Sequence, residues 1–209
     1  MIRKEYNSDK FEFPFIAYTP ENVTGKLPII IQLHGAGEVG LGNEDLSKIE
    51  IYGFPQFFKT NEIPCILVLP QCPPDSFWVA QLQNVHTFIE KLKGEFDIDE
   101  NRIYLTGVSM GGYGTWYTAM AYPETFAAIV PVCGGGMGWR APVLQMPIWA
   151  FHGSEDCAVD VHETMHMIHR VRQHSQNDVR MTIFDNVDHD SWIPAYTMEL
   201  LEWLLSKSK

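Results

Sequence analysis

Short continuous apolar runs recur along this chain from residue 28 onward, and each is bounded by proline, glycine or polar residues. Runs of this kind are typical of strands buried on both faces of a parallel sheet. They predict strands at Ile29–Leu33, Pro64–Leu69, Arg102–Thr106, Ala127–Cys133, Pro147–Phe151 and Met181–Phe184. Nearer the N-terminus, the alternation of Phe11, Phe13 and Phe15 with other residues predicts a half-exposed strand that ends at Pro20. In the run that contains Pro131 we expect the ladder to end near that proline, because a central strand tolerates proline poorly.

Between these runs, apolar residues recur at helical spacing. The pattern predicts a helix through Val85 and Leu92, one from Tyr113 to Tyr122, one through Val161, Met165, Ile168 and Val171, and an amphipathic helix over Pro194–Leu205. A weaker helical pattern covers Asn43–Ile51. Strands that alternate with helices predict a mostly parallel central sheet with helices on both faces. We expect one α/β domain over residues 1–209, since the length is ordinary for a single core.

The strand at Arg102–Thr106 and the helix that follows enclose the sequence Gly107-Val108-Ser109-Met110-Gly111. A Gly-x-Ser-x-Gly turn between a strand and a helix is a nucleophile elbow, a motif for which α/β-hydrolases are the standard example. The turn strains the serine, so small residues are needed on both sides of it. We expect the Ser109 oxygen to stand exposed, facing the Met110 amide at the helix N-terminus.

A serine nucleophile needs a base and a group that orients the base. His189 lies in the loop between the last predicted strand and the last helix, and Asp156 lies just after the strand that ends at Phe151. Both loops follow the carboxyl ends of strands, where open α/β sheets place their sites. The order Ser109, Asp156, His189 is also the order of the hydrolase triad. We expect the neighbouring Asp160 to cap the next helix instead.

Net charge and cysteine content limit the possible partners and the expected cellular compartment. A net charge of −11 argues against nucleic acid and anionic membranes as partners. Neither a signal peptide nor a spanning segment is visible, and the four scattered cysteines indicate reduced buried thiols. We therefore expect a cytoplasmic protein; the oligomeric state is left open.

These motifs resemble the α/β-hydrolase superfamily, in its esterase branch related to polyhydroxybutyrate depolymerases, feruloyl-type esterases, carboxylesterases and proteins described as predicted peptidases. The resemblance rests on Leu33–Glu38, Gly107–Trp116, Phe151–Asp156 and His189–Trp192. It implies Ser109 as nucleophile, His189 as base, Asp156 as acid, and the backbone amides of Met110 and Ala36 as the oxyanion hole. It implies no cofactor. The chain departs from the family where a proline is usual and Asp160 stands instead, and where an arginine is usual and Val39 stands instead.

A competing motif lies on the helix through Met165. The sequence His162-Glu163-Thr164-Met165-His166 matches the H-E-x-x-H pattern of zinc metallopeptidases. A catalytic zinc site needs a third ligand, which the chain does not clearly signal, so a solvated helix flank is the simpler interpretation and we predict no metal site. A non-enzymatic binding protein on the same scaffold is a further alternative, disfavoured because all three triad residues are present.

The expected activity is hydrolysis of carboxylic esters through an acyl-enzyme, with a serine peptidase or thioesterase on the same triad as alternatives. Only residues 134–146 separate two predicted strands where a lid is commonly inserted, so we expect no cap domain and an open groove. An open groove favours short acyl or aromatic acyl esters, including carbohydrate-linked ones. Gly37, Trp78 and Trp192 are candidate substrate-binding residues, and Phe77 and Trp139 are further aromatic candidates for the rim or the core.

Overall fold

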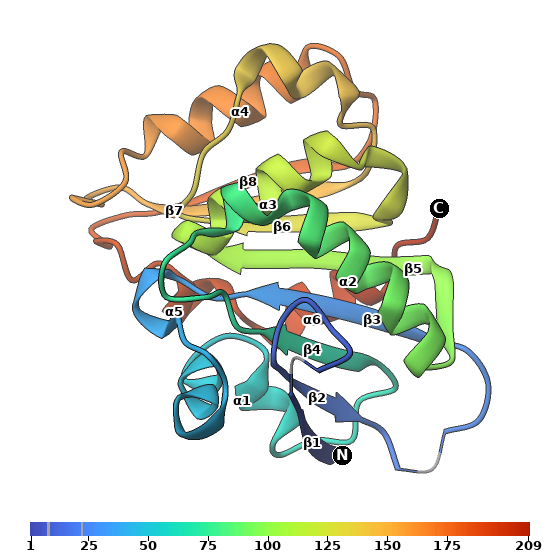
Figure 1. Ribbon diagram of the computed structural model, residues 1–209. Helices are drawn as coiled ribbons and strands as arrows, with labels where there is room; N and C mark the ends of the chain where they lie inside the picture. Colours follow the sequence, from blue (N-terminus) through green and yellow to red (C-terminus); the bar gives the residue numbers. More distant parts are fainter. Residues whose placement is uncertain (8, 22) are drawn as a thin grey trace.

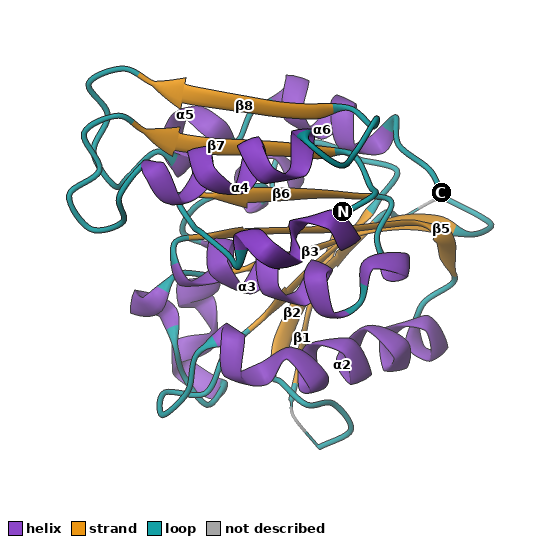
Figure 2. Cartoon of the chain, turned by 90° about the horizontal axis from the view of Figure 1, so that it is seen from above, coloured by secondary structure: helices purple, strands orange, loops and turns teal. Residues whose placement is uncertain are grey.

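The computed structural model describes residues 1–7, 9–21 and 23–209, except for the side chain of Glu44. An eight-stranded sheet runs through the molecule in the order β1-β2-β4-β3-β5-β6-β7-β8 (Figures 1 and 2). Its strands are β1 (Ile2–Tyr6), β2 (Phe15–Thr19), β3 (Leu27–Leu33), β4 (Ile66–Pro70), β5 (Ile98–Val108), β6 (Ala128–Val132), β7 (Ile148–Gly153) and β8 (Val179–Phe184). Strand β2 pairs antiparallel with β1 and β4, and every neighbouring pair from β4 to β8 is parallel.

Helices cover both faces of the sheet, and each face has its own apolar core. The helices are α1 (Pro55–Phe58), α2 (Leu82–Glu95), α3 (Met110–Ala121), α4 (His162–Arg172), α5 (Trp192–Ala195) and α6 (Met198–Leu205). Short 3-10 helices span Ala36–Glu38, Asn43–Glu50, Trp78–Gln81, Pro123–Thr125 and Gly138–Val143. Buried side chains of α2, α3 and α4 pack in one core, and those of α1 and α6 pack in the other. The architecture is the α/β-hydrolase fold that the sequence predicts.

Each predicted buried strand is present, within a few residues at its ends. Two differences lie at the N-terminal side of the sheet. The sequence pattern did not reveal β1, because four of its five residues are exposed and leave no apolar run. Strand β2 is buried along almost its whole length rather than half-exposed, since β1 and β4 flank it and the ring of Phe15 lies within the core.

The ladder of β6 ends near Pro131, as the sequence predicts, but one residue after the proline and not at it. Strand β6 continues through Val132, which pairs with Val108 of β5 and Phe151 of β7. The amides of Ile129 and Cys133 donate to β7, at Pro147 O (3.1 Å) and Phe151 O (2.8 Å). Alternation along the strand places the missing N–H of Pro131 between these two donors, so the proline removes one ladder bond without ending the strand.

The helices differ from the prediction at three places. The predicted C-terminal helix is two helices, because Tyr196 is extended and the Thr197 side chain caps α6 by accepting from the Leu200 amide. The segment predicted as a helix from Asn43 is a 3-10 helix. On α4 the buried side chains are those of Thr164, Met167, Ile168 and Val171, while Met165 is exposed, contrary to the predicted apolar stripe.

The connection between β6 and β7 carries only the 3-10 helix Gly138–Val143, which packs against α4, and forms no cap over the strand ends. Across the residues described, no helix is both long and apolar enough to span a bilayer. The carboxyl ends of the parallel strands therefore open toward solvent at one end of the sheet, where the segments after β3, β5, β7 and β8 meet (Figure 1).

Candidate active site

Ser109 is the single residue between β5 and α3, and its backbone has a φ of 53°, in the left-handed region. The turn is tight because backbone segments cross at van der Waals distance on both sides. A Cβ on Gly107 would lie 2.3 Å from Gly111 O, and one on Gly111 would lie 2.2 Å from Leu33 O. Neither position admits a side chain, as the elbow motif requires. The strained serine is thus held at the top of the central strand.

The structure brings Ser109, His189 and Asp156 into one chain of hydrogen bonds. Ser109 Oγ lies 2.8 Å from His189 Nε2, and His189 Nδ1 lies 2.8 Å from Asp156 Oδ2 and 3.0 Å from Oδ1. Since a carboxylate only accepts, the proton is on Nδ1, and Nε2 accepts from the serine hydroxyl. The imidazole therefore has the tautomer that a general base for Ser109 needs.

The Asp156 carboxylate is fully buried, and both of its oxygens accept hydrogen bonds. Its Oδ1 accepts the amides of Ala158 (2.9 Å) and Val159 (2.8 Å). A second histidine, His152 at the end of β7, places Nε2 3.2 Å from Oδ2 and 2.9 Å from Val159 O. Burial lowers the pKa of His152, which favours a neutral ring with its proton on Nε2. Asp156 thus lies between two imidazoles, and sequence reasoning identified only His189.

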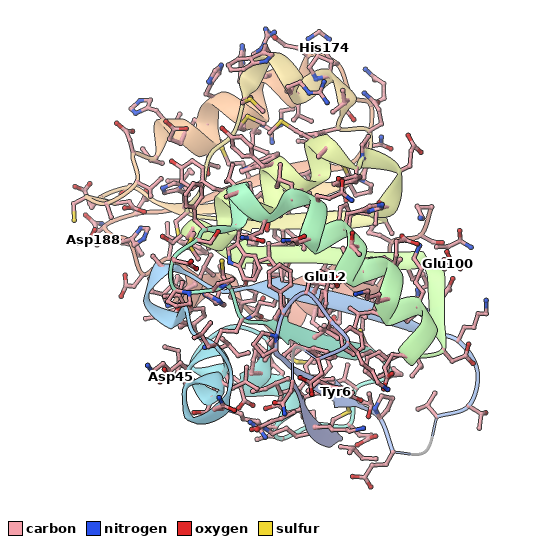
Figure 3. The ribbon with its side chains drawn as sticks, in the orientation of Figure 1. Tyr6, Glu12, Asp45, Glu100, His174 and Asp188 are labelled. Atoms are coloured by element: carbon pink, nitrogen blue, oxygen red, sulfur yellow. The ribbon has the colours of Figure 1, made fainter. Side chains whose placement is uncertain are left out.

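The loops that carry the acid and the base are joined by Asp188. Its Oδ1 accepts the amides of Cys157 (3.0 Å) and His189 (2.7 Å). These bonds, with the Cys157 amide first, lower the pKa of the Asp188 carboxyl. The Glu155 amide also donates to Val187 O at 2.9 Å. Figure 3 shows Asp188 at the end of the sheet where these loops meet, with Glu100 toward the opposite end.

The loop after β3 faces the serine with its own network. Ala36 begins a 3-10 helix and, with Gly37, lines the cavity that contains Ser109. The Tyr52 hydroxyl accepts the Gly35 amide at 2.8 Å and donates to the Glu38 carboxylate. Burial, followed by the Glu38 bond, raises the pKa of Tyr52. The Tyr52 side chain therefore holds the segment that offers the Ala36 amide. No motif in the sequence pointed to Tyr52.

Met110 is the first residue of α3, so its amide has no intrahelical acceptor and lies at the positive end of the helix dipole. An amide at this position and one from the loop after β3 are the two donors of a hydrolase oxyanion hole. The structure places Met110 directly after the serine and Ala36 across the cavity from it. Their role as donors to an oxyanion stays a prediction.

The prediction that Trp78 contributes to substrate binding is wrong. Trp78 is fully buried, and its ring packs edge-on against Phe13 and His34 with centroids 5.4 and 5.1 Å away. Its Nε1 donates to His34 O at 2.9 Å. The tryptophan therefore packs against the start of the loop after β3 and does not line the cavity that contains Ser109.

His34, at the end of β3, is also buried, and its Nε2 accepts the Cys72 amide at 2.9 Å. Desolvation lowers the pKa of this imidazole to about 4, so the ring is neutral at neutral pH. A neutral ring is what this contact requires, because an imidazolium has no lone pair with which to accept.

The cavity above Ser109 has a volume of about 220 Å³ and is lined by Gly35, Ala36, Gly37, Glu38, Tyr52, Val108, Ser109, His189 and Trp192. Trp192 packs edge-on against His189, with centroids 5.5 Å apart. Of the predicted substrate-binding residues, Gly37 and Trp192 thus line the cavity. Phe77 and Trp139 are exposed but are not among the lining residues.

The histidines of the competing motif do not converge. His162 points to Asp160, with Nδ1 2.7 Å from Oδ1, and its side chain is 79% exposed. The Asp160 carboxylate also accepts the His162 amide at 2.9 Å, as expected of a helix-capping residue. Glu163 and His166 instead lie against the backbone at Gly135 and Gly138.

Among the described residues, one group of three potential metal ligands has its ligand atoms within 4.8 Å of one another: Cys133, Asp156 and His189. It includes no residue of α4. Burial raises the pKa of the Cys133 thiol to about 12, so this sulfur is protonated and a poor ligand at neutral pH. Cys65, Cys72 and Cys133 are buried free thiols as predicted, whereas Cys157 is exposed.

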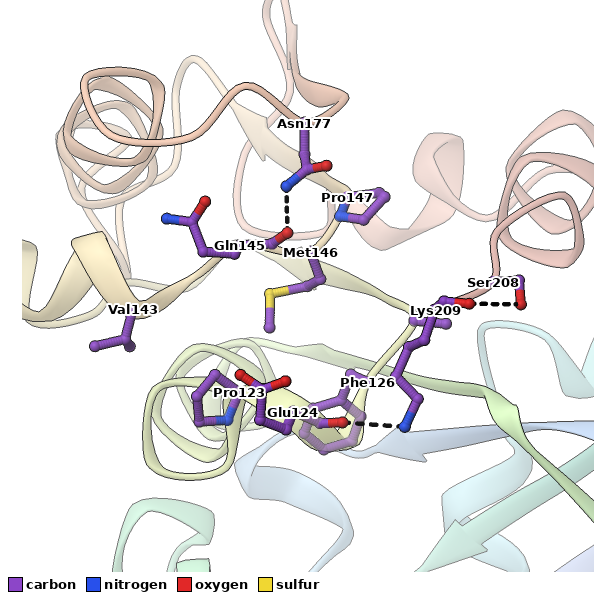
Figure 4. A pocket seen from close by; sticks show the side chains of 11 residues that line it. Pro123, Glu124, Phe126, Val143, Gln145, Met146, Pro147, Asn177, Ser208 and Lys209 are labelled. Atoms are coloured by element: carbon purple, nitrogen blue, oxygen red, sulfur yellow. Dashed lines mark hydrogen bonds between the residues drawn. The ribbon is translucent and has the colours of Figure 1, made fainter.

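A separate cavity of about 340 Å³ lies near the amino ends of β6, β7 and β8, at the other end of the sheet (Figure 4). Polar groups there are paired with the protein backbone: Lys209 Nζ donates to Glu124 O at 3.0 Å, and the Asn177 side-chain amide donates to Gln145 O. The cavity contains none of the predicted site residues, and its polar groups do not converge on an unoccupied point.

Comparison with known proteins points to ester hydrolysis. A family model described as phospholipase/carboxylesterase matches residues 76–206. The bifunctional acetylxylan esterase/xylanase of Neocallimastix patriciarum is 27% identical over 146 residues, covering 65% of this chain and 20% of that protein. Poly(3-hydroxyalkanoate) depolymerase C of Paucimonas lemoignei is 22% identical over 131 residues, covering 56% of this chain and 30% of the depolymerase. The chain thus spans less than a third of the length of either curated relative.

Solved structures agree on the architecture. A thermostable esterase is 33% identical, with a TM-score of 0.84, and the match covers 100% of this chain and 63% of the esterase. The feruloyl esterase module from Clostridium thermocellum, solved with sinapinate, is 15% identical with a TM-score of 0.71, covering 98% of this chain and 86% of the module. The second likeness concerns the fold alone.

Proposed function

This chain belongs to the phospholipase/carboxylesterase family of α/β-hydrolases, and we propose that it hydrolyses carboxylic esters with Ser109 as nucleophile. The observation that carries the proposal is the continuous hydrogen-bonded chain from Ser109 Oγ through His189 to the buried Asp156 carboxylate. His189 thus bonds to two residues that lie 33 and 80 positions away in the chain. Such an arrangement serves to remove a proton from the serine as it attacks a carbonyl.

In the acylation step, Ser109 Oγ attacks the ester carbonyl carbon while its proton passes to His189 Nε2. Asp156 holds the imidazole by Nδ1 and stabilises the imidazolium that forms. The carbonyl oxygen becomes an oxyanion that accepts from the Met110 and Ala36 amides, a contribution of about 3–4 kcal/mol for each donor. His189 then gives its proton to the departing alcohol oxygen, and the acyl group remains on Ser109.

In the deacylation step, water replaces the alcohol. His189 Nε2 accepts a proton from the water as its oxygen attacks the acyl carbon, and a second oxyanion forms in the same place. Collapse of this intermediate releases the acid, and the proton on His189 returns to Ser109 Oγ. Each step uses the same contacts, so no further group is required.

The open cavity supports short acyl or aromatic acyl esters, including esters linked to carbohydrate. At about 220 Å³, with no cap domain above it, the cavity cannot enclose a long alkyl chain. Each CH₂ that stays in water forgoes about 0.8 kcal/mol of burial. We expect kcat/KM to be highest from acetyl to butyryl or for aromatic acyl groups, without activation at lipid interfaces.

The test separates serine chemistry from metal chemistry. A serine-directed phosphonate should add covalently to Ser109, identified by mass spectrometry of the labelled peptide, and Ser109→Ala should abolish both labelling and ester hydrolysis. EDTA should leave the rate unchanged, and the double variant His162→Ala/His166→Ala should behave as the parent protein does. Loss of activity in EDTA with recovery on adding zinc would disprove the proposal.

A further inference from the structure

A second cavity adjoins the one that contains Ser109. It has a volume of about 310 Å³ and is lined by Ile51, Tyr52, Gly53, Gln56, Phe57, Trp192, Ile193 and Tyr196. Tyr52 and Trp192 line both cavities, and their ring centroids lie 5.4 Å apart at an interplanar angle of 37°. The two cavities therefore share this ring pair as a common wall.

The lining of the second cavity is apolar and aromatic. None of its residues carries a charge, and four of them contribute rings. Three of their polar side-chain groups already bond within the protein. The Tyr52 hydroxyl bonds to Gly35 and Glu38, the Gln56 Nε2 donates to Glu50 O at 3.2 Å, and the Tyr196 hydroxyl lies 2.8 Å from Thr106 Oγ1. The surface left for an occupant is therefore mostly apolar.

Large apolar side chains are also left in solvent at the mouth of this cavity. Ile51 is 61% exposed and Ile193 is 68% exposed. Exposed apolar residues that gather beside a cavity mark a binding surface more often than residues that are scattered singly. Here the two isoleucines come from segments more than a hundred residues apart in the chain and line the same cavity, which shares Tyr52 and Trp192 with the cavity that contains Ser109.

The wall that carries Tyr52 is fixed in place before any ligand arrives. Gln32, a side chain only 2% exposed at the end of β3, accepts the Phe54 amide at 2.9 Å and donates to Tyr52 O at 3.1 Å. Gly53 between them has a φ of 81°, and a Cβ there would lie 2.5 Å from the Gln32 amide. A buried amide thus determines the turn, so the cavity is preorganised.

We propose that this second cavity is a substrate subsite that binds an uncharged aromatic ring carried by the ester, while the ester carbonyl lies at Ser109. The inference rests on the proposed function. Aromatic walls favour a ring because edge-on and offset contacts add to simple burial. Trp192 connects the subsite to His189 and Tyr52 connects it to the loop after β3, so the ring enters from either the alcohol side or the acyl side of the carbonyl.

Two pairs of substrates test the subsite and identify the side. Benzyl acetate against methyl acetate places the ring on the alcohol, and methyl phenylacetate against methyl acetate places it on the acyl group. Each kcat/KM is divided by the rate of alkaline hydrolysis to remove intrinsic reactivity. We expect a preference of about tenfold for the ring in at least one pair, which corresponds to roughly 55 Å² buried at about 25 cal/mol per Å². No preference in either pair would overturn the proposal.

A matched pair of variants locates the effect. Ile193→Asn replaces an exposed isoleucine at the subsite, and Ile2→Asn makes the same change at a 51% exposed isoleucine on the edge strand β1. We expect Ile193→Asn to reduce the ring preference about threefold, and Ile2→Asn to leave the preference as it is. An equal change in both variants, or none in Ile193→Asn, would contradict the assignment.

A binding measurement keeps this result separate from catalysis. The ketone 4-phenylbutan-2-one keeps a carbonyl and a ring but has no leaving group, and calorimetry on the Ser109→Ala protein measures its dissociation constant. It should bind about tenfold more tightly than butan-2-one, and Ile193→Asn should weaken it about threefold. If phosphonate labels Ser109 but neither ketone preference nor ester preference appears, the subsite fails and the proposed function stands. If the ketone preference appears but Ser109→Ala keeps full activity, the proposed function fails instead.

Discussion

The histidines at the carboxyl ends of the strands differ from those along α4 in what faces their rings. His34, His152 and His189 each lie within hydrogen-bond distance of groups from segments distant in the chain. His162 instead pairs with Asp160 two residues before it. His169 likewise contacts Gln173, four residues after it. The first group bonds to segments brought together by the sheet, whereas His162 and His169 bond to residues close to them in the chain.

The difference shows why a local motif is weak evidence for a site. The pattern from His162 to His166 fixes two imidazoles one turn apart, but a catalytic zinc needs a third ligand that only tertiary structure can supply. At the strand ends the reverse holds: Ser109, Asp156 and His189 are far apart in sequence, and parallel strands bring their ends to one edge. Convergence from several elements, more than residue type, distinguishes the two regions.

The largest expected effect separates two carboxylates of the same loop. Asp156→Asn should lower kcat by about 10⁴-fold, because the amide then stabilises the wrong imidazole tautomer and no imidazolium. Asp160→Asn, four residues later and facing only α4, should keep kcat within about twofold. Steady-state kinetics on both purified variants decides the matter. Equal losses, or the larger loss in Asp160→Asn, would contradict the assignment of the acid.

The buried ring of His34 should also make folding stability depend on pH. The pKa of His34 is about 4 in the folded protein, against a value near 6.5 when it is unfolded. Between these values the unfolded chain binds more protons, so folding stability is lost as pH falls through the window. This group alone should remove about 2 kcal/mol between pH 7 and pH 5, above the ordinary titration range of carboxylates.

Urea unfolding at the two pH values measures that loss. His34→Gln keeps an acceptor for the Cys72 amide but does not titrate, so its stability should change less between pH 7 and pH 5 than that of the parent by about 2 kcal/mol. A parental dependence in His34→Gln would show that the ring is protonated in the folded state.

His152 should affect the rate through Asp156 and leave substrate binding unchanged. Its Nε2 lies 3.2 Å from Asp156 Oδ2, the oxygen that His189 Nδ1 also contacts at 2.8 Å. His152→Leu should lower kcat by about tenfold to a hundredfold with KM nearly constant, because a carboxylate displaced by about 1 Å no longer orients the base. His152→Gln, which restores an N–H donor, should recover part of the loss. A fall in thermal stability without a change in kcat would mean that His152 only packs the core.

The smallest effect concerns the start of α4. Asp160→Ala removes the carboxylate that accepts the His162 amide, and the loss of such a cap costs about 1 kcal/mol of unfolding free energy. Asp160→Asn should cost much less, since asparagine caps nearly as well. Thermal melts of the two variants at pH 7 compare them directly. A larger loss in Asp160→Asn would mean that charge, more than the cap, is what α4 requires.

The alternation of apolar runs identified the sheet because strands buried on both faces leave a signal in a single sequence. The order of Ser109, Asp156 and His189 then placed the site, since parallel strands present their following loops at one edge. The edge strand β1 left no such signal, because its side chains face solvent. The break before α6 was also missed: Tyr196 is buried, so the apolar pattern continues across a turn that Thr197 caps.

Residues that act through others were harder to predict. In the sequence, Trp78 cannot be told apart from an aromatic residue at the rim of a binding site. Only its packing against His34 shows that it is buried next to the loop after β3. Tyr52, Gln32 and His152 contribute through contacts with segments 17 to 22 residues away or with a buried carboxylate. Neither spacing nor periodicity encodes such contacts. The nucleophile was predictable because its turn is a local motif, whereas the groups that hold its surroundings are not.

The crossing of backbones around Ser109 limits how this enzyme can change over evolution. Gly107, Gly111, Gly112 and Gly134 each lie so close to another backbone that a Cβ would fall within 2.5 Å of it. Random mutation at any of these positions has no neutral outcome, so the elbow cannot drift while the fold persists. Side chains on the wall, such as Ile51 and Ile193, are exposed and free of that restriction. A laboratory library that keeps the four glycines and diversifies that wall would avoid the variants in which a Cβ overlaps the backbone of the elbow.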